Sequence, residues 1–568
     1  MSDLLTNKLT IILSKNKFAK NIIMERVKMD YDYDNRPHQR MDLLERARLC
    51  WEGMSGFREE RERNKRFTYG DQWGDMVETP SGRMREEEYI RMQGNMPLKN
   101  NLIRRLVRNV LGVFRNRWTP PRCVARDPEE RGRAEVMQRL LDYNMEINRL
   151  EEVYARTMEE FLISGMAVHR KWFGTKGQQT DCWTDAVSPE NFFIDTDSRD
   201  FRNWDVSLIG ELHDMEFPAL CAAFARGEDD YDRLLDLYSP PARGDAPSGG
   251  GFGSGGMRST FQTPSSSGAC RVIEVWTREY RAHYRCHDPR SGEWFRIPLS
   301  SRRREVEEEN RRRRRRDPDT PDSELLIKSR WIMEEEWHYH FLTPDGYLLA
   351  EGITPYRHGR HPYVVKAYPF IDGEIHSFVG DIIDQQKFTN RLISMYDWIL
   401  RASAKGVLLF PEGALPDGVE IADVAEEWSR FNGVIVFRPR AGMPLPQQVS
   451  SNATNIGITD LLNIQMKMME DISGVNGALQ GKLDSSSMSG TLYDQQTRNS
   501  LTSLADLLKS YTDFILDASA VDVSNIRQYY DDERLGAVLG ESESLAESRN
   551  FFDSTFDFSL REGEPAAG

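Results

Sequence analysis

Long apolar runs are missing from this sequence. The most apolar stretch near its start, the five residues Leu9–Leu13, is followed at once by Lys15, Lys17 and Lys20. That stretch is too short for the core of a signal peptide, and no later run approaches the roughly 18 apolar residues of a membrane-spanning helix. We therefore expect neither an export signal nor a membrane partner.

Cysteine is scarce as well, and the six cysteines include no CxxC pair. They are Cys50, Cys123, Cys182, Cys221, Cys270 and Cys286. A disulfide framework or a zinc ribbon would need closer and more regular spacing, so neither is expected. Scattered cysteines fit a reducing cytoplasm best.

Basic residues are fewer than acidic residues in this sequence. Lys and Arg number 75 against 90 Asp and Glu, which gives a formal net charge of -15. Proteins that hold phosphate backbones tightly rely on clustered Lys and Arg. The charge balance therefore argues against a strong nucleic-acid binder.

Catalytic motifs are missing too. The glycine-rich stretch Gly249–Gly256 lacks the Lys-Ser/Thr pair with which a P-loop binds phosphate and Mg²⁺, and no strand pattern leads into it. His283, Cys286 and His287 lie close together but have no fourth ligand at a zinc-site spacing, so we interpret them as surface polar residues. We expect no enzyme activity, no catalytic residue, no metal site and no cofactor.

The sequence does contain enough apolar side chain for a large folded protein. Of its 568 residues 39% are hydrophobic, including 26 Phe and 12 Trp. At ~150 residues per domain this length favours about four domains. Helical and strand-like patterns occur in separate blocks, which predicts an α+β fold.

The first block is helical. Met41–Arg66 and Asn100–Trp118 carry apolar residues at spacings of three and four, and Pro120-Pro121 ends the second segment. Two further helices are predicted between Pro128 and Gly165. Several arginines on the second segment are interpreted as a solvated face, with membrane or DNA contact as the alternative. They are Arg104, Arg105, Arg108, Arg115 and Arg117.

Strand-like runs rich in Val, Trp, Phe and Ile follow the helical block. They cover Met166–Phe173, Asp181–Ile194, Val272–Tyr280 and Trp331–Leu349. The last run contains a turn at Thr343-Pro344-Asp345-Gly346. His338 and His340 share one face of it, and we interpret both as structural.

Two segments interrupt the strands. Residues 239–270 are rich in Gly, Ser and Pro and are expected to form a flexible surface loop. Residues 300–322 include six consecutive arginines, Arg311–Arg316, and are expected to be a flexible loop or an exposed helix. Nucleic acid is a conceivable partner of these arginines, but neighbouring Glu307, Glu308 and Glu309 compete for them.

The helical period returns in the last third of the chain. Asp381–Ala402 carries one apolar stripe, and Gly457–Ile472 and Thr491–Tyr530 are also predicted helices. The stripe is Phe388, Leu392, Met395, Tyr396 and Ile399. Between the first two helices, Lys405–Arg440 is expected to form a small insertion with strands at Val407–Phe410 and Val434–Phe437.

This ordered series resembles phage portal proteins, most closely those of short-tailed phages. The segments that carry the resemblance are Asp381–Arg391, Ile472–Asn476, Gly481–Leu483, Ser489–Leu492, Phe161–Trp172 and Ser188–Asn191. The resemblance covers most of Met41–Tyr530, and it depends on order and pattern rather than on one diagnostic motif.

The resemblance implies a ring-forming portal fold, with a mainly helical wing and stem, a small α/β clip and β-rich wing segments. The implied regions are an N-terminal extension (1–35), the wing (36–380), stem helix one (381–403), the clip (404–445), stem helix two (446–480), a channel loop (481–490), a long helix returning to the wing (491–535) and a short C-terminal segment (536–568) with a crown that is minimal or absent.

The resemblance also implies site residues. Lys482, Asp484, Ser485, Ser486 and Ser487 would form the loop that approaches DNA in the channel. A small hydrated loop can touch a moving polyanion without strong contacts, whereas an ordinary interhelix loop is the alternative. In the clip, Glu412, Asp417 and Glu420 would contact the packaging motor or a tail adaptor.

The implied function is a dodecameric channel at one capsid vertex of the virion, which nucleates capsid assembly and serves genome packaging and ejection. Implied partners are further copies of the chain, the terminase large subunit, the major capsid protein and scaffold, a tail adaptor and the double-stranded DNA in the channel. Two other hypotheses stay open. The arginine-rich segments suggest a nucleic-acid-processing enzyme or motor subunit, and the third hypothesis is a tail adaptor or another oligomeric virion protein.

Overall fold

The computed structural model describes most of the chain. The described residues are 39–80, 82–238, 260–266, 268–292, 294–299, 303–405, 407–411, 414–416, 418–429, 434–439, 442, 444–449, 457–475, 501–540 and 558–561. The predicted N-terminal extension (1–35) and channel loop (481–490) lie outside them.

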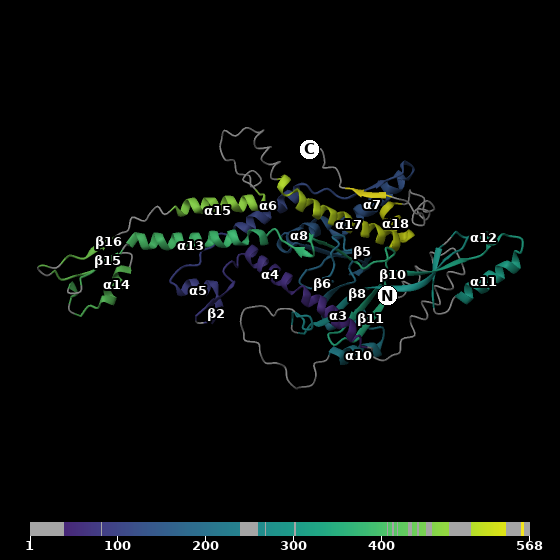
Figure 1. Cartoon of the computed structure of the whole chain (residues 1–568), viewed down its shortest axis with the longest axis horizontal. Helices are drawn as coiled ribbons and strands as arrows, with labels where there is room; N and C mark the ends of the chain where they lie inside the picture. Colours follow the sequence, from purple (N-terminus) through teal and green to yellow (C-terminus); the bar gives the residue numbers. More distant parts are fainter. Residues whose placement is uncertain are drawn as a thin grey trace. The chain divides into compact units, whose positions relative to one another are not determined.

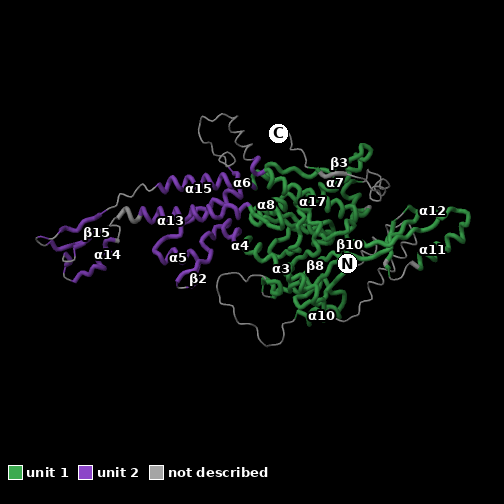
Figure 2. Tube along the Cα trace, in the orientation of Figure 1, with its two compact units in different colours: residues 1–61, 111–377, 505–568 green, residues 62–110, 378–504 purple. Residues whose placement is uncertain are grey.

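The chain forms two compact units, each built from segments that are distant in sequence (Figure 2). Unit 1 comprises Met1–Arg61, Leu111–Ser377 and Ala505–Gly568, and unit 2 comprises Glu62–Val110 and Phe378–Leu504. The sequence scheme treats 36–380 as one continuous wing, whereas here residues 62–110 belong to the same unit as the helices after 380. The chain passes between the units inside helices α4 (Ser55–Tyr69) and α6 (Leu102–Asn116).

Unit 1 is built around antiparallel sheets. The larger sheet has the strand order β11-β10-β8-β7-β6, with β9 paired to β8, and the smaller has the order β12-β4-β5. Their bounds are β4 Met166–Lys176, β5 Gln179–Ala186, β6 Phe192–Ile194, β7 Leu208–Met215, β8 Cys270–His287, β9 Trp294–Pro298, β10 Lys328–Leu342, β11 Leu348–Ile353 and β12 Tyr363–Ala367. Two short ladders join β3 Arg122–Ala125 to β17 Phe558–Arg561 and β13 Pro369–Ile371 to β14 Glu374–Ile375.

The helices of unit 1 precede, interrupt and follow these strands (Figure 1). They are α3 Met41–Gly53, η1 Pro128–Glu130, α7 Arg131–Asn148, α8 Leu150–Ser164, α9 Phe217–Phe224, α10 Glu228–Tyr238, α11 Arg303–Arg316, α12 Asp322–Leu325, α17 Ala505–Tyr529 and α18 Asp532–Leu539. Antiparallel sheets with helices in separate blocks make an α+β fold, as the sequence predicts.

The main core of unit 1 lies between α3 and the larger sheet. The predicted stripe of α3 is buried there, with Leu43, Ala47 and Trp51 packed among strand residues such as Phe193. The Trp51 and Phe193 rings meet edge to face, with their centroids 6.5 Å apart. A second core joins α7, α17 and α18, because the periodic apolar residues of all three helices converge on it.

The turn predicted at Thr343–Gly346 is confirmed. The backbone N–H of Gly346 donates to the carbonyl oxygen of Thr343 at 2.9 Å, and Gly346 has a φ of +82°. Glycine adopts that left-handed conformation without steric cost, which is why it occupies the last turn position.

Both predicted loops are more ordered than expected where the structure describes them. In the segment 239–270, Phe261 is buried against Trp51 and Phe193. Arg271 holds this stretch by donating to the carbonyl oxygens of Thr260 and Thr263. In the segment 300–322, α11 forms, so the exposed-helix alternative is the correct one there. Local composition could not reveal these tertiary anchors.

Unit 2 contains two helices that lie side by side, α13 (Ile383–Lys405) and α15 (Ile458–Ser473) (Figure 1). The short helix η2 (Gly380–Ile382) precedes α13. The other elements are β1 Met76–Thr79, β2 Gly82–Arg85, α5 Glu86–Met92, β15 Val407–Leu409, α14 Ile421–Ser429 and β16 Gln447–Val449. The helices predicted at Asp381–Ala402 and Gly457–Ile472 are thereby confirmed.

One of the two strands predicted in the insertion is confirmed and the other is wrong. The strand predicted at Val407–Phe410 forms as β15 and pairs with β16. Residues 434–437 are not a strand, and Val434 and Val436 are exposed. A run of β-branched residues favours extended backbone, but only a hydrogen-bonded neighbour makes it a strand.

Candidate functional site

The predicted site residues are largely outside the described part of the chain. Lys482, Asp484, Ser485, Ser486 and Ser487 lie there, and so do Glu412 and Asp417. Glu420 is described and exposed, directly before α14. Its backbone N–H donates to Asp423 Oδ2 at 2.9 Å. The roles of all eight residues therefore stay predictions.

The segment Asp381–Arg391, which the sequence analysis singled out, provides a buried polar cluster in unit 2. The Oε1 atom of Gln386 in α13 accepts hydrogen bonds from the backbone N–H groups of Leu102 and Ile103, with distances of 3.0 and 3.3 Å. Its Nε2 donates to the Asn100 carbonyl oxygen at 2.7 Å and to Asn390 Oδ1 at 2.9 Å. Because the first N–H groups of a helix have no partner within it, Gln386 caps the start of α6 from another helix.

Ion pairs border this cluster. Lys387 Nζ lies 2.8 Å from Asp75 Oδ2, and Arg391 lies 2.7 Å from Glu86 Oε1. Partial burial alone would raise the pKa of Asp75, but hydrogen bonds and charge from Lys387 and Arg63 outweigh it and lower this pKa. The charged residues of the segment therefore fix α13 within unit 2.

The outward side of α15 is apolar. Leu461, Ile464, Met468 and Ile472 follow at steps of three and four, and each is between 42% and 48% exposed. This spacing puts all four on one helix face, while Ile458 and Met469 are buried on another. A solvent-facing stripe of this kind usually marks an interaction surface.

Its neighbour α13 also exposes large apolar side chains. They are Phe388, Met395, Tyr396, Trp398 and Leu400. Of the apolar stripe predicted for this helix, Leu392 is buried, whereas Phe388 and Met395 are 43% and 49% exposed. Only part of this stripe is therefore buried within the chain.

One group of potential metal ligands occurs among the described residues, namely Glu211, His213 and Glu274 in unit 1. The guanidinium of Arg170 lies beside this group, 3.2 Å from Glu274 and 3.6 Å from Glu211. Burial alone would raise the pKa of Glu274, but Arg170 and His213 lower it to about 2. The cluster holds its own cation, so its side chains do not fit a bound metal ion.

The histidine and cysteine group of β8 is not a surface group. His283 and Cys286 are buried, because β8 is paired on both edges here and Val306 of α11 packs over Cys286. His283 lies 3.4 Å from Glu336. The surface interpretation of these two residues is therefore wrong, while the structural interpretation of His338 and His340 fits their burial near Glu336 and Glu351.

A buried ion pair was not anticipated from the sequence. Lys171 of β4 and Asp522 of α17 meet at 2.6 Å with almost no exposure, and Lys171 also donates to Thr184 Oγ1 at 2.9 Å. Burial raises the pKa of Asp522 and lowers that of Lys171. The only sequence signal was a charged residue at a position where the strand or helix pattern predicts an apolar one.

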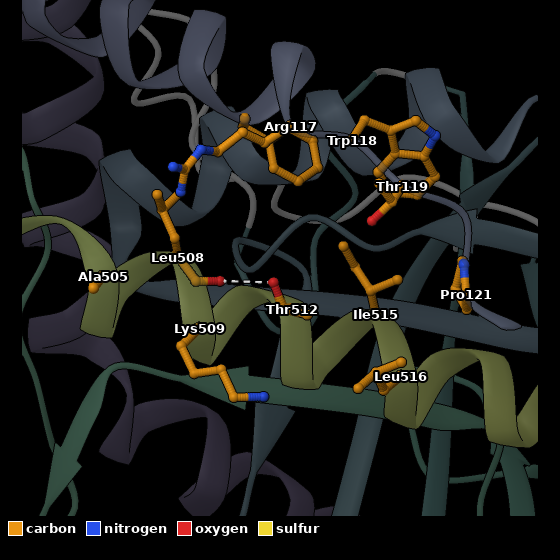
Figure 3. A pocket seen from close by; sticks show the side chains of 11 residues that line it. Arg117, Trp118, Thr119, Pro121, Ala505, Leu508, Lys509, Thr512, Ile515 and Leu516 are labelled. Atoms are coloured by element: carbon orange, nitrogen blue, oxygen red, sulfur yellow. Dashed lines mark hydrogen bonds between the residues drawn. The ribbon is translucent and has the colours of Figure 1, made fainter. Parts of the chain in front are cut away.

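A hollow of unit 1 lies between the end of α6 and α17 (Figure 3). Phe114, Trp118, Leu508 and Ile515 supply most of its apolar lining. The Thr512 hydroxyl donates to the Leu508 carbonyl oxygen of its own helix at 3.0 Å, so it is already engaged.

Among the described residues, no helix is both long and apolar enough to cross a membrane. A comparison with curated proteins gives no match. A model of the family described as Phage P22-like portal protein matches residues 44–549, which is most of the chain. Portal proteins are structural and not enzymes. The chain therefore belongs to the P22-like portal protein family, that is, to the head-to-tail connectors of short-tailed phages that act in DNA packaging.

Proposed function

We propose that twelve copies of this chain form a ring at one capsid vertex, with a central channel through which the genome is packaged and ejected. The ring would nucleate capsid assembly, dock the terminase large subunit, and later bind a tail adaptor. It would also contact the major capsid protein and scaffold.

The exposed apolar stripe of α15 is the observation that supports assembly most directly. Each fully buried large apolar side chain contributes about 1.5–3 kcal/mol relative to an exposed one. Leu461, Ile464, Met468 and Ile472 are only about half buried within one chain, so a neighbouring copy can gain stability by covering them. Repetition around a closed ring would cover the stripe in every copy.

Within this proposal, α13 and α15 are the stem and residues 404–445 are the clip. Residues 481–490 form the channel loop, with Lys482 and Asp484–Ser487 near the DNA. Glu420, with Glu412 and Asp417, offers carboxylates to the motor or adaptor. Charge reversal at all three positions should impair genome packaging, and unchanged packaging would remove them as contacts.

Electron microscopy of the purified full chain, with rotational averaging, tests the architecture. We expect twelvefold rings with an open centre wide enough for duplex DNA. Persistent monomers or dimers under several salt and concentration conditions would refute the ring. A closed centre would refute the channel.

A further inference from the structure

In the arginine run of α11, some residues form ion pairs with neighbouring carboxylates and others do not. The helix contains eight arginines and four glutamates, against a net charge of -15 for the whole chain. All six residues of Arg311–Arg316 belong to its last two turns. Their individual contacts decide what the run can bind.

Arg313 has a structural role. Its guanidinium forms a two-pronged contact with Asp288, with both nitrogen–oxygen distances at 2.7 Å, and both side chains are buried. Hydrogen bonding to Asp288 also raises the pKa of Arg313. Val306 packs beside it into a small core with Cys286, Ile297 and Ile327. These contacts fix one side of α11 against β8, β9 and β10.

Two more arginines have local partners. Arg311 lies 3.9 Å from Glu307, and Arg314 pairs with Asp322 of α12. Glu309 lies 3.3 Å from Arg313. Glu307 and Glu309, two of the three glutamates that could compete for the arginine run, are therefore engaged with particular arginines.

Arg312, Arg315 and Arg316 are different. All three are exposed, and none has an ion pair or hydrogen bond to the described residues. They stand three and four positions apart, so they share one helix face. Glu308 and Glu309 lie one turn before Arg312, and Glu309 already contacts Arg313. The last six residues of the helix contain no acidic side chain.

We propose that this face of α11, formed by Arg312, Arg315 and Arg316, docks the phosphate backbone of double-stranded DNA. The proposal rests on the proposed function, which brings the chain close to the packaged genome. Guanidinium groups match phosphate oxygens in charge and in planar two-pronged geometry. Because the face has no apolar anchor, its contacts are to the backbone, independent of base sequence, and reversible in salt.

The geometry favours DNA over an acidic protein. A protein interface of useful affinity is built around buried aromatic or aliphatic anchors. On α11 the sole apolar residue, Val306, is buried in the chain's own core. Regularly spaced phosphates need no such anchor.

The test measures binding of the assembled full chain to a fluorescent 30-base-pair duplex by anisotropy between 50 and 200 mM salt. The variant is Arg312→Gln/Arg315→Gln. The matched control is Arg311→Gln/Arg314→Gln, which removes the same charge from the same helix but from paired positions. Each lost phosphate contact lowers the slope of log affinity against log salt by about 0.9.

In the variant we expect the slope of log affinity against log salt to fall by about 1.8, and the DNA affinity at 150 mM salt to fall on the order of tenfold. Both losses should be clearly smaller in the control. Equal losses in the two proteins, or no loss in either, would overturn the proposal. Binding of polyglutamate that falls in the variant while DNA binding does not would also overturn it, in favour of an acidic protein. Ring formation is scored separately by electron microscopy, so intact rings with unchanged DNA binding refute this inference alone.

Discussion

Unit 1 and unit 2 differ in what lies in their interiors. Unit 1 has large apolar cores and also buries a charged pair, Lys171 and Asp522. Unit 2 instead places polar side chains, Gln386 and Asn390, in its interior and exposes apolar ones on α13 and α15.

This difference shows which part of the chain is complete alone. The core side chains of unit 1 pack against one another, so the stability of these cores depends on contacts within one copy. Unit 2 retains an apolar surface that water solvates poorly, so a second surface is needed to cover it.

Carboxylates on the α15 stripe should have the largest effect. Ile464→Glu/Met468→Glu places two charges per copy where a neighbouring copy would bury them, so rings should be lost. Sedimentation velocity should then show monomers with unchanged helix content by circular dichroism. Thr459→Glu/Asn463→Glu adds the same charge to the opposite, exposed face of α15 and should assemble normally. Rings from the stripe variant would show that the stripe is not an interface.

Breaking the buried pair should cost the most within unit 1. Asp522→Ala leaves the Lys171 ammonium buried without its carboxylate, which should lower the free energy of unfolding by about 3–5 kcal/mol. Urea unfolding and hydrogen exchange of α17 would measure it. Asp513→Ala removes one partner of an exposed pair on the same helix, with Lys509, and should cost less than about 1 kcal/mol.

A second variant separates charge burial from packing in that site. Lys171→Met/Asp522→Leu replaces the pair by apolar side chains and should recover most of the lost stability. If Asp522→Ala and Asp513→Ala are equally stable, the pair contributes nothing special to unit 1.

The polar interior of unit 2 should be less costly to disturb. Gln386→Leu removes the side-chain acceptor of the Leu102 and Ile103 N–H groups and leaves that of Ile103 without an acceptor, which should cost about 1–3 kcal/mol. Gln385→Leu is the matched control, because the Oε1 of Gln385 makes no hydrogen bond in the described structure. Exchange of the first amides of α6 should accelerate in the first variant only, and equal protection in both would contradict the capping role.

The smallest effect should appear as a pH dependence. The pKa of Glu274 is lowered from 4.5 to about 2, so its stabilising contribution is complete above about pH 4.5 and is lost as the pH falls through about 2. The free energies of unfolding of wild type and of Glu274→Gln should therefore become more similar as the pH falls from about 4.5 to about 2. A constant difference for Glu274→Gln over that window would exclude a lowered pKa.

Local patterns were sufficient for the longer helices and several of the longer strands. The apolar spacing in Met41–Arg66 predicted one helix where the structure has two, α3 and α4, and the turn at Thr343–Gly346 followed from its residue types. These features depend on neighbours within a few positions, which the sequence states directly. The portal family also followed from the order of such segments, and the family match confirms it.

Features that depend on distant residues were not predicted. Phe261 in a Gly- and Ser-rich segment is buried because Trp51 and Phe193 lie beside it, and Val407–Leu409 pairs with 447–449, which was not predicted to be a strand. The run Arg311–Arg316 looks uniform in sequence, yet Asp288 and Asp322 divide it into paired and unpaired residues.

Composition and periodicity were enough to predict the α+β class and the longer helices, and the order of the segments was enough to predict the family. Which side of an amphipathic helix is buried within the chain depended on the fold. Periodicity gives α13 and α15 apolar stripes, but burial requires a neighbouring surface at the right distance, and the sequence does not contain that distance. The exposed faces of α15 and α11 became visible for this reason only once the chain was folded.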